Sequence, residues 1–264
     1  MTLDRIGRSV VAGVEYVGGL SIQFGRGAAG LARLNPWRAS RLRWQAAIRQ
    51  MAIVGVEALP VVCLIAGFIG LIMALQGAYE LKKFGALHYV VSLVGVSITR
   101  ELGPLMTAII VVGRSGSAFA AEIGTMTVTE EVDALRTMAL EPVDFLLVPK
   151  FVSMLVMMPC LVIAADTAGI LGGAFFTWVT LGMGIRHYLA TTLEVLFLRD
   201  VVTGLIKSVA FGMIIVQVGC FEGFQVRGGP EGVGRATTRA VVQSIFLVIL
   251  ADLGFTAFFY IFWS

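Results

Sequence analysis

Five long apolar stretches alternate with short polar segments along the chain. They cover residues 58–78, 89–113, 151–183, 201–221 and 240–263. An α-helix rises about 1.5 Å per residue, so about 20 apolar residues cross the hydrocarbon of a bilayer. The alternation of apolar and polar positions that is typical of a membrane β-barrel is absent from the sequence. The pattern predicts an all-α polytopic membrane protein with five transmembrane helices.

The composition supports this fold class. Of the 264 residues, 58% are hydrophobic and only 14% are charged, whereas soluble domains are about half apolar and about a quarter charged. A soluble chain of this length has no core large enough to bury so much apolar surface. We therefore exclude a disordered chain, a secreted disulfide scaffold and a soluble enzyme.

Residues 5–34 mix apolar side chains with arginines before the first apolar stretch, and five glycines lie between Gly7 and Gly25. We interpret this segment as an amphipathic helix that lies on the membrane surface. A sixth, poorly apolar transmembrane helix is the alternative. The sequence thus divides into an N-terminal interfacial region, 1–50, and a transmembrane domain, 51–264.

The distribution of lysine and arginine predicts the orientation. Segments 1–57, 114–150 and 222–239 contain fourteen basic residues, and segments 79–88 and 184–200 contain four. Cytoplasmic segments of membrane proteins carry the excess of positive charge. We therefore expect a cytoplasmic N-terminus and a periplasmic C-terminus.

Four charged residues within the predicted transmembrane helices are the main candidates for function. Arg100 and Glu101 lie in the second helix, Lys207 in the fourth and Asp252 in the fifth. A charge in the bilayer costs several kcal/mol unless it is paired or hydrated. We expect the four to neutralise one another at a helix interface or in a hydrated cavity, for function or for structure alone. Asp166, in the third helix, stays unassigned.

The segment between the second and third helices is the longest polar insertion. Thr127 and Glu130 have the spacing of a capping box, which predicts the start of a short helix that Pro142 ends. Its first turn is acidic, and its apolar face suits either the bilayer surface or the groove of a partner protein. Anionic lipid headgroups disfavour the carboxylates, so we favour a protein partner.

Several other chemistries find little support. The sequence has no GxxxxGK[ST] motif for nucleotide binding, and its three cysteines lack the spacing of a metal site. Gly113–Ser115–Gly116 resembles the GxSG pattern of an intramembrane serine protease, but the two histidines are predicted on the opposite side of the membrane. A secondary transporter that relays protons through the buried charges remains an alternative.

Three motifs resemble one known family. They are TRELGPLMTAIIVVGRSGSAFAAEIGTM (99–126), TEEVDALRTMALEPVDFLLVPK (129–150) and GGPEGVGRATTRAVVQS (228–244). In this order they are similar to the permease subunits of MlaE/YrbE type, which serve bacterial ABC transporters of lipids. The resemblance implies a permease for phospholipids that maintains outer-membrane lipid asymmetry, or an Mce-type permease for another hydrophobic substrate.

The resemblance also implies the partners. Two copies of the chain would assemble in the bacterial inner membrane with a cytoplasmic ABC ATPase dimer, a STAS-domain protein and a periplasmic hexamer of MCE-domain proteins. The chain itself would hold no cofactor, since the ATPase would bind ATP and Mg²⁺. Phospholipid, not nucleic acid, would be the ligand.

The resemblance assigns roles to particular residues. The family's coupling helix corresponds to the TEEVDAL stretch, which implies that an ATPase contacts Glu130, Glu131, Asp133 and Arg136. The family's lipid cavity lies between the two copies. The residues assigned to that cavity are Arg100, Glu101, Lys207 and Asp252, with Met73, Leu81 and Phe84 at its mouth.

Overall fold

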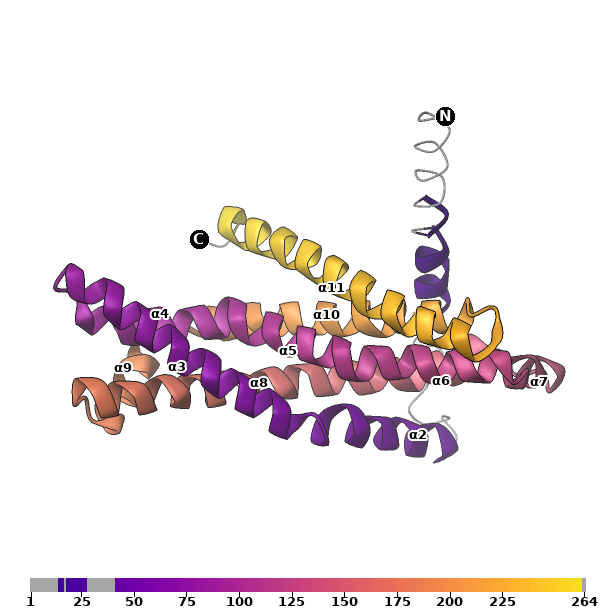
Figure 1. Ribbon diagram of the computed structural model, residues 1–264, viewed down its shortest axis with the longest axis horizontal. Helices are drawn as coiled ribbons and strands as arrows, with labels where there is room; N and C mark the ends of the chain where they lie inside the picture. Colours follow the sequence, from indigo (N-terminus) through magenta and orange to yellow (C-terminus); the bar gives the residue numbers. More distant parts are fainter. Residues whose placement is uncertain (1–13, 17, 28–40, 263–264) are drawn as a thin grey trace.

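The computed structural model describes residues 14–16, 18–27 and 41–262, and these segments contain helices and turns but no strand (Figure 1). Residues 14–16 and 18–27 are helical. The helices that follow are α2 (Arg41–Met51), α3 (Leu59–Lys83), α4 (Val90–Ser97), α5 (Gly103–Val111), α6 (Ser117–Val128), α7 (Glu131–Thr137), α8 (Val148–Leu181), α9 (Ile185–Val195), α10 (Leu198–Phe224) and α11 (Gly229–Phe262).

Within the described residues, five continuous helical stretches are long and apolar enough to cross a membrane. They are Trp44–Lys83, Leu87–Val128, Val143–Leu181, Leu198–Phe224 and Gly229–Phe262. The prediction of five transmembrane helices is therefore confirmed. Each stretch extends beyond its apolar centre, because the polar residues at the ends continue the helix instead of starting a loop.

Turns of π-helix occur in the first three of these stretches. Ile98–Leu102 and Val112–Gly116 interrupt the second stretch on either side of α5, and Ala52–Val56 and Val143–Leu147 precede α3 and α8. A proline occupies the first turn of α3, α5 and α8. Proline has no N–H to bond the preceding turn, so the helix accommodates it by widening locally.

The closest helix pair is α3 against α8. A methyl group added at Gly70 of α3 would lie 1.8 Å from the backbone oxygen of Gly169 in α8. Small residues at such contacts let transmembrane helices approach at backbone distance, where dispersion forces are strongest. The glycines of the third apolar stretch therefore hold α3 against the centre of the bundle.

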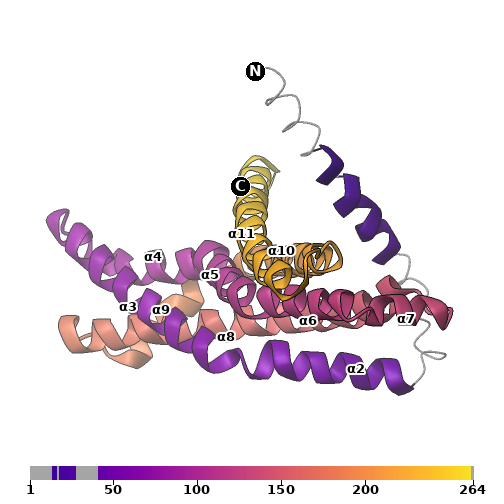
Figure 2. The ribbon, with the colours of Figure 1, turned by 45° about the vertical axis from the view of Figure 1, so that its right-hand side comes forward.

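The two ends of the bundle carry different elements. The turn before α11 and α7 lie at one end, and α9 and the turn between α3 and α4 lie at the other (Figure 1). Residues 18–27 run across the long axis of the bundle near the α7 end (Figures 1 and 2). This direction agrees with an interfacial helix rather than a sixth span. Residues 5–13, 17 and 28–34 of the predicted segment lie outside the described residues.

Contacts with α10 and α11 hold the N-terminal helix. The ring of Tyr16 meets Phe221 edge to face, with 5.2 Å between centroids, and Gln217 of α10 donates to the Leu20 carbonyl over 2.8 Å. Tyr16 also donates to Gln243 of α11. Burial and the neighbouring Glu222 carboxylate raise the pKa of Tyr16, so its hydroxyl remains a donor.

The predicted capping box is wrong. α6 continues to Val128, and Thr127 Oγ1 donates to the Ile123 carbonyl inside that helix over 2.8 Å. α7 begins only after Glu130, whose φ of 61° breaks the helix direction. Pro142 does not end α7 either.

A Schellman motif ends α7 instead. Leu140 N–H bonds the Leu135 carbonyl over 3.0 Å, and Ala139, at φ 57°, bonds Arg136. Pro142 precedes the π-helical turn that leads into α8.

The last helix is the least covered of the five. α11 presents a row of exposed apolar side chains, and its C-terminal half diverges from α10 (Figure 1). The row includes Val242, Phe246, Ile249, Leu250 and Leu253. In a membrane, this face contacts lipid or another apolar surface.

We expect Gly70→Ala to lower the free energy of unfolding by about 1–3 kcal/mol, because the new methyl group meets backbone that has no room to move. Thermal unfolding of the purified protein in detergent measures the effect. Gly254→Ala in α11 is the control, since nothing lies within 4 Å of the added carbon. Equal unfolding temperatures for the two variants would contradict close packing at Gly70.

Candidate functional site

A buried lysine joins three of the membrane-spanning helical stretches. Lys207 of α10 is fully buried, and its Nζ lies 2.6 Å from Glu101 Oε2 and 2.9 Å from Asp252 Oδ1. Nζ also donates to Thr256 Oγ1 over 2.8 Å, and that hydroxyl donates to Glu101 Oε1 over 3.1 Å. We call Glu101, Lys207, Asp252 and Thr256 the ionic cluster.

Local helix geometry puts these groups together. Asp252 and Thr256 are four residues apart on α11, so they share one face of the helix. Glu101 lies in the π-helical turn Ile98–Leu102, just before the proline of α5. π-Helical turns re-aim side chains and are frequent at functional sites.

Exposure is uneven across the ionic cluster. Lys207 is fully buried, whereas the Glu101 side chain is 37% exposed and that of Asp252 is 15% exposed. The cluster therefore opens on the side of its carboxylates. An exposed carboxylate beside apolar helix surfaces is able to meet a polar group of a bound amphiphile.

The structure brings together three of the four predicted charges. Arg100 is the exception: it faces Asp200 at the start of α10, with 3.7 Å between Nη1 and Oδ1. The side chains of successive helical residues point about 100° apart, so Arg100 and Glu101 contact different neighbours. The expected four-residue cluster is corrected to a three-residue cluster and a separate pair.

Asp200 belongs to the predicted polar segment 184–200, but it is buried. Its Oδ2 accepts a hydrogen bond from the Phe197 N–H over 3.1 Å, which caps the N-terminus of α10. An acidic residue three positions after a predicted helix start is the sequence signal for such a cap.

A second buried lysine was not predicted at all. Lys150 of α8 is 2% exposed, and its Nζ lies 2.5 Å from Glu122 Oε2 of α6 and 4.9 Å from the ring centroid of Phe119. Its position directly after the apolar run FLLVP was the available signal. Glu122 belongs to the segment that the sequence predicts as a polar insertion, so the sequence does not indicate this pair.

The predicted coupling residues lie together at one end of the molecule. Glu130, Glu131, Asp133 and Arg136 are all exposed on or beside α7. Asp133 pairs with Arg136 over 2.7 Å, and Val132 is buried toward the bundle. The helix therefore turns its apolar residue inward and leaves an acidic surface outside.

The predicted mouth residues lie toward the other end. Met73 and Leu81 are half-buried between α3 and α4, and Phe84 is exposed in the turn after α3. His88 and His187 belong to the turn between α3 and α4 and to α9, while Ser115 is buried between α5 and α6. Neither histidine therefore lies next to Ser115, as the mechanism of a serine protease would require.

Asp166 of α8 is buried against Gly103, and its Oδ1 has no hydrogen-bond partner among the described residues. The described residues contain no group of three histidine, cysteine or acidic side chains that is arranged to hold a metal ion.

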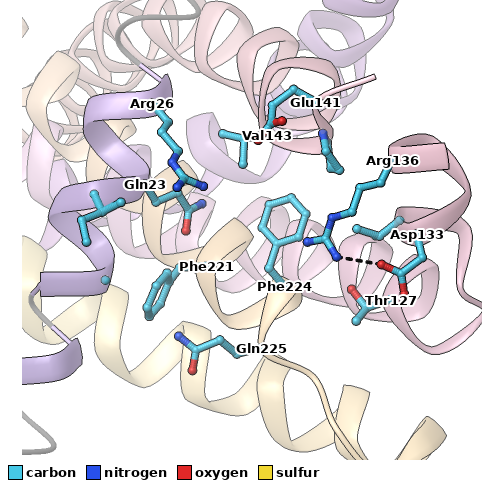
Figure 3. A pocket seen from close by; sticks show the side chains of 14 residues that line it. Gln23, Arg26, Thr127, Asp133, Arg136, Glu141, Val143, Phe221, Phe224 and Gln225 are labelled. Atoms are coloured by element: carbon cyan, nitrogen blue, oxygen red, sulfur yellow. Dashed lines mark hydrogen bonds and ion pairs between the residues drawn. The ribbon is translucent and has the colours of Figure 1, made fainter. Parts of the chain in front are cut away.

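A hollow of about 340 Å³ lies at the α7 end, between residues 18–27, residues 131–143 and the end of α10 (Figure 3). We call residues 131–143 the α7 segment. Gln23 and Arg26 reach it from the N-terminal helix, and Arg136 and Glu141 from the α7 segment. Phe224 of α10 lies between these two walls.

Comparison with known proteins defines the class. Residues 47–258 match the family model "Permease MlaE". A probable ABC transporter permease protein of Rickettsia typhi is 40% identical over 205 residues, covering 78% of this chain and 79% of the relative. One from Synechocystis is 37% identical over 212 residues, covering 80% and 81%.

A plant relative is more distant. The chloroplastic protein TRIGALACTOSYLDIACYLGLYCEROL 1 of Arabidopsis thaliana is 33% identical over 220 residues, covering 83% of this chain and 63% of the relative. Five membrane-spanning helices and these relatives define an ABC transporter permease. The chain belongs to the MlaE permease family.

We expect Lys207→Met to destabilise the protein by about 3–5 kcal/mol, because it leaves the largely buried Asp252 and the partly exposed Glu101 without their cation. The triple variant Lys207→Met/Glu101→Gln/Asp252→Asn removes these charges and should recover most of the loss. Thermal unfolding in one detergent compares the three proteins. A triple variant no more stable than the single one would contradict the ionic account.

Proposed function

We propose that this permease moves phospholipids in an ATP-driven transporter that maintains outer-membrane lipid asymmetry. The observation that supports this proposal most strongly is the ionic cluster, whose partly exposed Glu101 carboxylate lies among apolar helices. A phospholipid needs such a combination: a polar anchor for its headgroup and apolar surfaces for its acyl chains. The plant relative is named after a glycerolipid, trigalactosyldiacylglycerol, and this name supports a lipid substrate.

In this proposal, an ABC ATPase dimer docks on α7 from the cytoplasm. The exposed Glu130, Glu131 and Asp133 would face the ATPase, which binds ATP and Mg²⁺. The π-helical turns of the second stretch join this end to Glu101 within one continuous helix. Movement of α7 would then shift the balance between two arrangements of the ionic cluster.

A second copy of the chain would cover the exposed apolar face of α11. Closed two-fold pairing is the commonest symmetry of homo-oligomers, and it would place two ionic clusters beside one lipid cavity. The proposed inner-membrane complex also includes a STAS-domain protein on the cytoplasmic side and an MCE-domain hexamer on the periplasmic side.

The coupling role predicts a charge effect on assembly. Glu130→Lys/Glu131→Lys should reduce co-purification of the ATPase subunit severalfold, because it reverses the charge of the acidic surface at the start of α7. Tagged permease from membranes is assayed by quantitative immunoblotting of the ATPase. Glu194→Lys on α9, an exposed glutamate at the other end, is the matched control. Unchanged ATPase recovery in the double variant would overturn the docking role.

The transport role predicts dependence on ATP. Proteoliposomes with the complete complex should transfer labelled phospholipid to an acceptor only with ATP and Mg²⁺, and Glu101→Gln should slow the transfer at equal protein levels. Transfer driven by a proton gradient without nucleotide would identify a secondary transporter instead. ATP-driven transfer of another hydrophobic molecule, with phospholipid inert, would identify an Mce-type permease of different specificity.

A further inference from the structure

The hollow at the α7 end lies at the depth of lipid headgroups. Phe221 and Phe224 line it, and Phe224 is the last residue of the membrane-spanning helix α10. The 27 residues of α10 extend about 40 Å, which exceeds the roughly 30 Å of bilayer hydrocarbon. The end of this helix therefore reaches the interface, and the hollow is separate from the ionic cluster within the bundle.

The wall formed by the N-terminal helix offers hydrogen-bond donors. Gln23 is only 8% exposed, and its Nε2 has no hydrogen-bond partner among the described residues. A buried amide without a partner costs about 1–3 kcal/mol, so a ligand that satisfies it gains that energy. Arg26, one helical turn further, forms no ion pair with a described residue and adds a guanidinium (Figure 3). Together the two side chains suit a phosphate group.

The wall formed by the α7 segment has a different charge. Arg136 and Asp133 neutralise each other over 2.7 Å. Glu141, at the end of this segment, is exposed and forms no ion pair with a described residue (Figure 3). The hollow thus presents, on separate walls, one cation and one carboxylate that form no ion pair with any described residue, and its four charged side chains balance.

Charge balance selects among phosphate-bearing ligands. A free phosphate or an anionic headgroup would satisfy Arg26 but would be repelled by Glu141. A zwitterion with a phosphate and a primary ammonium satisfies both side chains. The apolar side chains of Ile22, Phe221 and Phe224 at the same hollow favour an amphiphile over a soluble anion.

We propose that this hollow binds the headgroup of a zwitterionic aminophospholipid. The phosphate accepts hydrogen bonds from Arg26 and the Gln23 amide, and the ammonium faces Glu141. The glycerol and the first acyl carbons lie against Ile22 and the two phenylalanines. A bound headgroup links the N-terminal helix to the α7 segment, so this lipid ties together two elements that few direct bonds connect.

Photo-crosslinking of the full chain in nanodiscs tests the proposal. The probe is phosphatidylethanolamine with a diazirine near its glycerol, and mass spectrometry quantifies adducts on residues 18–27 and 138–143. Loss of a charge-assisted hydrogen bond is expected to lower these adducts about tenfold in Arg26→Ala. Arg235→Ala is the matched control, because that exposed arginine at the same end pairs with Glu231.

Two further arms separate the ligand chemistries. Glu141→Gln should reduce labelling by the ethanolamine probe but not by a phosphatidylglycerol probe. An excess of inorganic phosphate should leave labelling unchanged. Equal labelling of Arg26→Ala and the wild type would overturn the site, and displacement by inorganic phosphate would replace the lipid with a free anion. Neither result depends on ATPase docking or transport, so the proposed function is tested separately.

Discussion

A lysine ammonium fully surrounded by transmembrane helices is the constraint on which the rest of the structure depends. Hydrocarbon does not solvate such a charge, so the chain must supply its partners from other helices. Lys207 obtains them from the second and fifth membrane-spanning stretches through Glu101, Asp252 and Thr256. This requirement holds α11 to the body of the bundle at one level, although most of that helix is uncovered. The same bonds make the position of α11 sensitive to anything that competes for Glu101.

Close backbone contacts and ionic contacts both hold the bundle together, but they act between different helices. α3 meets α8 through Gly70 and Gly169, where no side chain intervenes and little movement is possible. α11 meets its neighbours through the ionic cluster and through apolar residues such as Val248 and Phe255, and it leaves a broad apolar face uncovered.

The sequence predicted what depends on local composition. Five stretches of about 20 apolar residues must become transmembrane helices, and charges such as Lys207 and Asp252 must find each other, because the alternative is costly. Ion pairs between residues of distant segments were harder to predict from the sequence. No residue near Arg100 in the sequence indicates that it pairs with Asp200. The sequence suggests that Lys150 ends a loop, and only the continuation of α6 past Glu122 brings these two side chains together. The hollow at the α7 end needs three separate segments, so no single motif marks it.

A cryo-electron microscopy map of the complex purified from native membranes in lipid nanodiscs tests the central claim most directly. The account predicts ATPase density against α7, a second copy against α11, and elongated lipid density that reaches the exposed side of Glu101. A map in which the ATPase is absent or binds at the α9 end, or in which Glu101 contacts only protein, would contradict it.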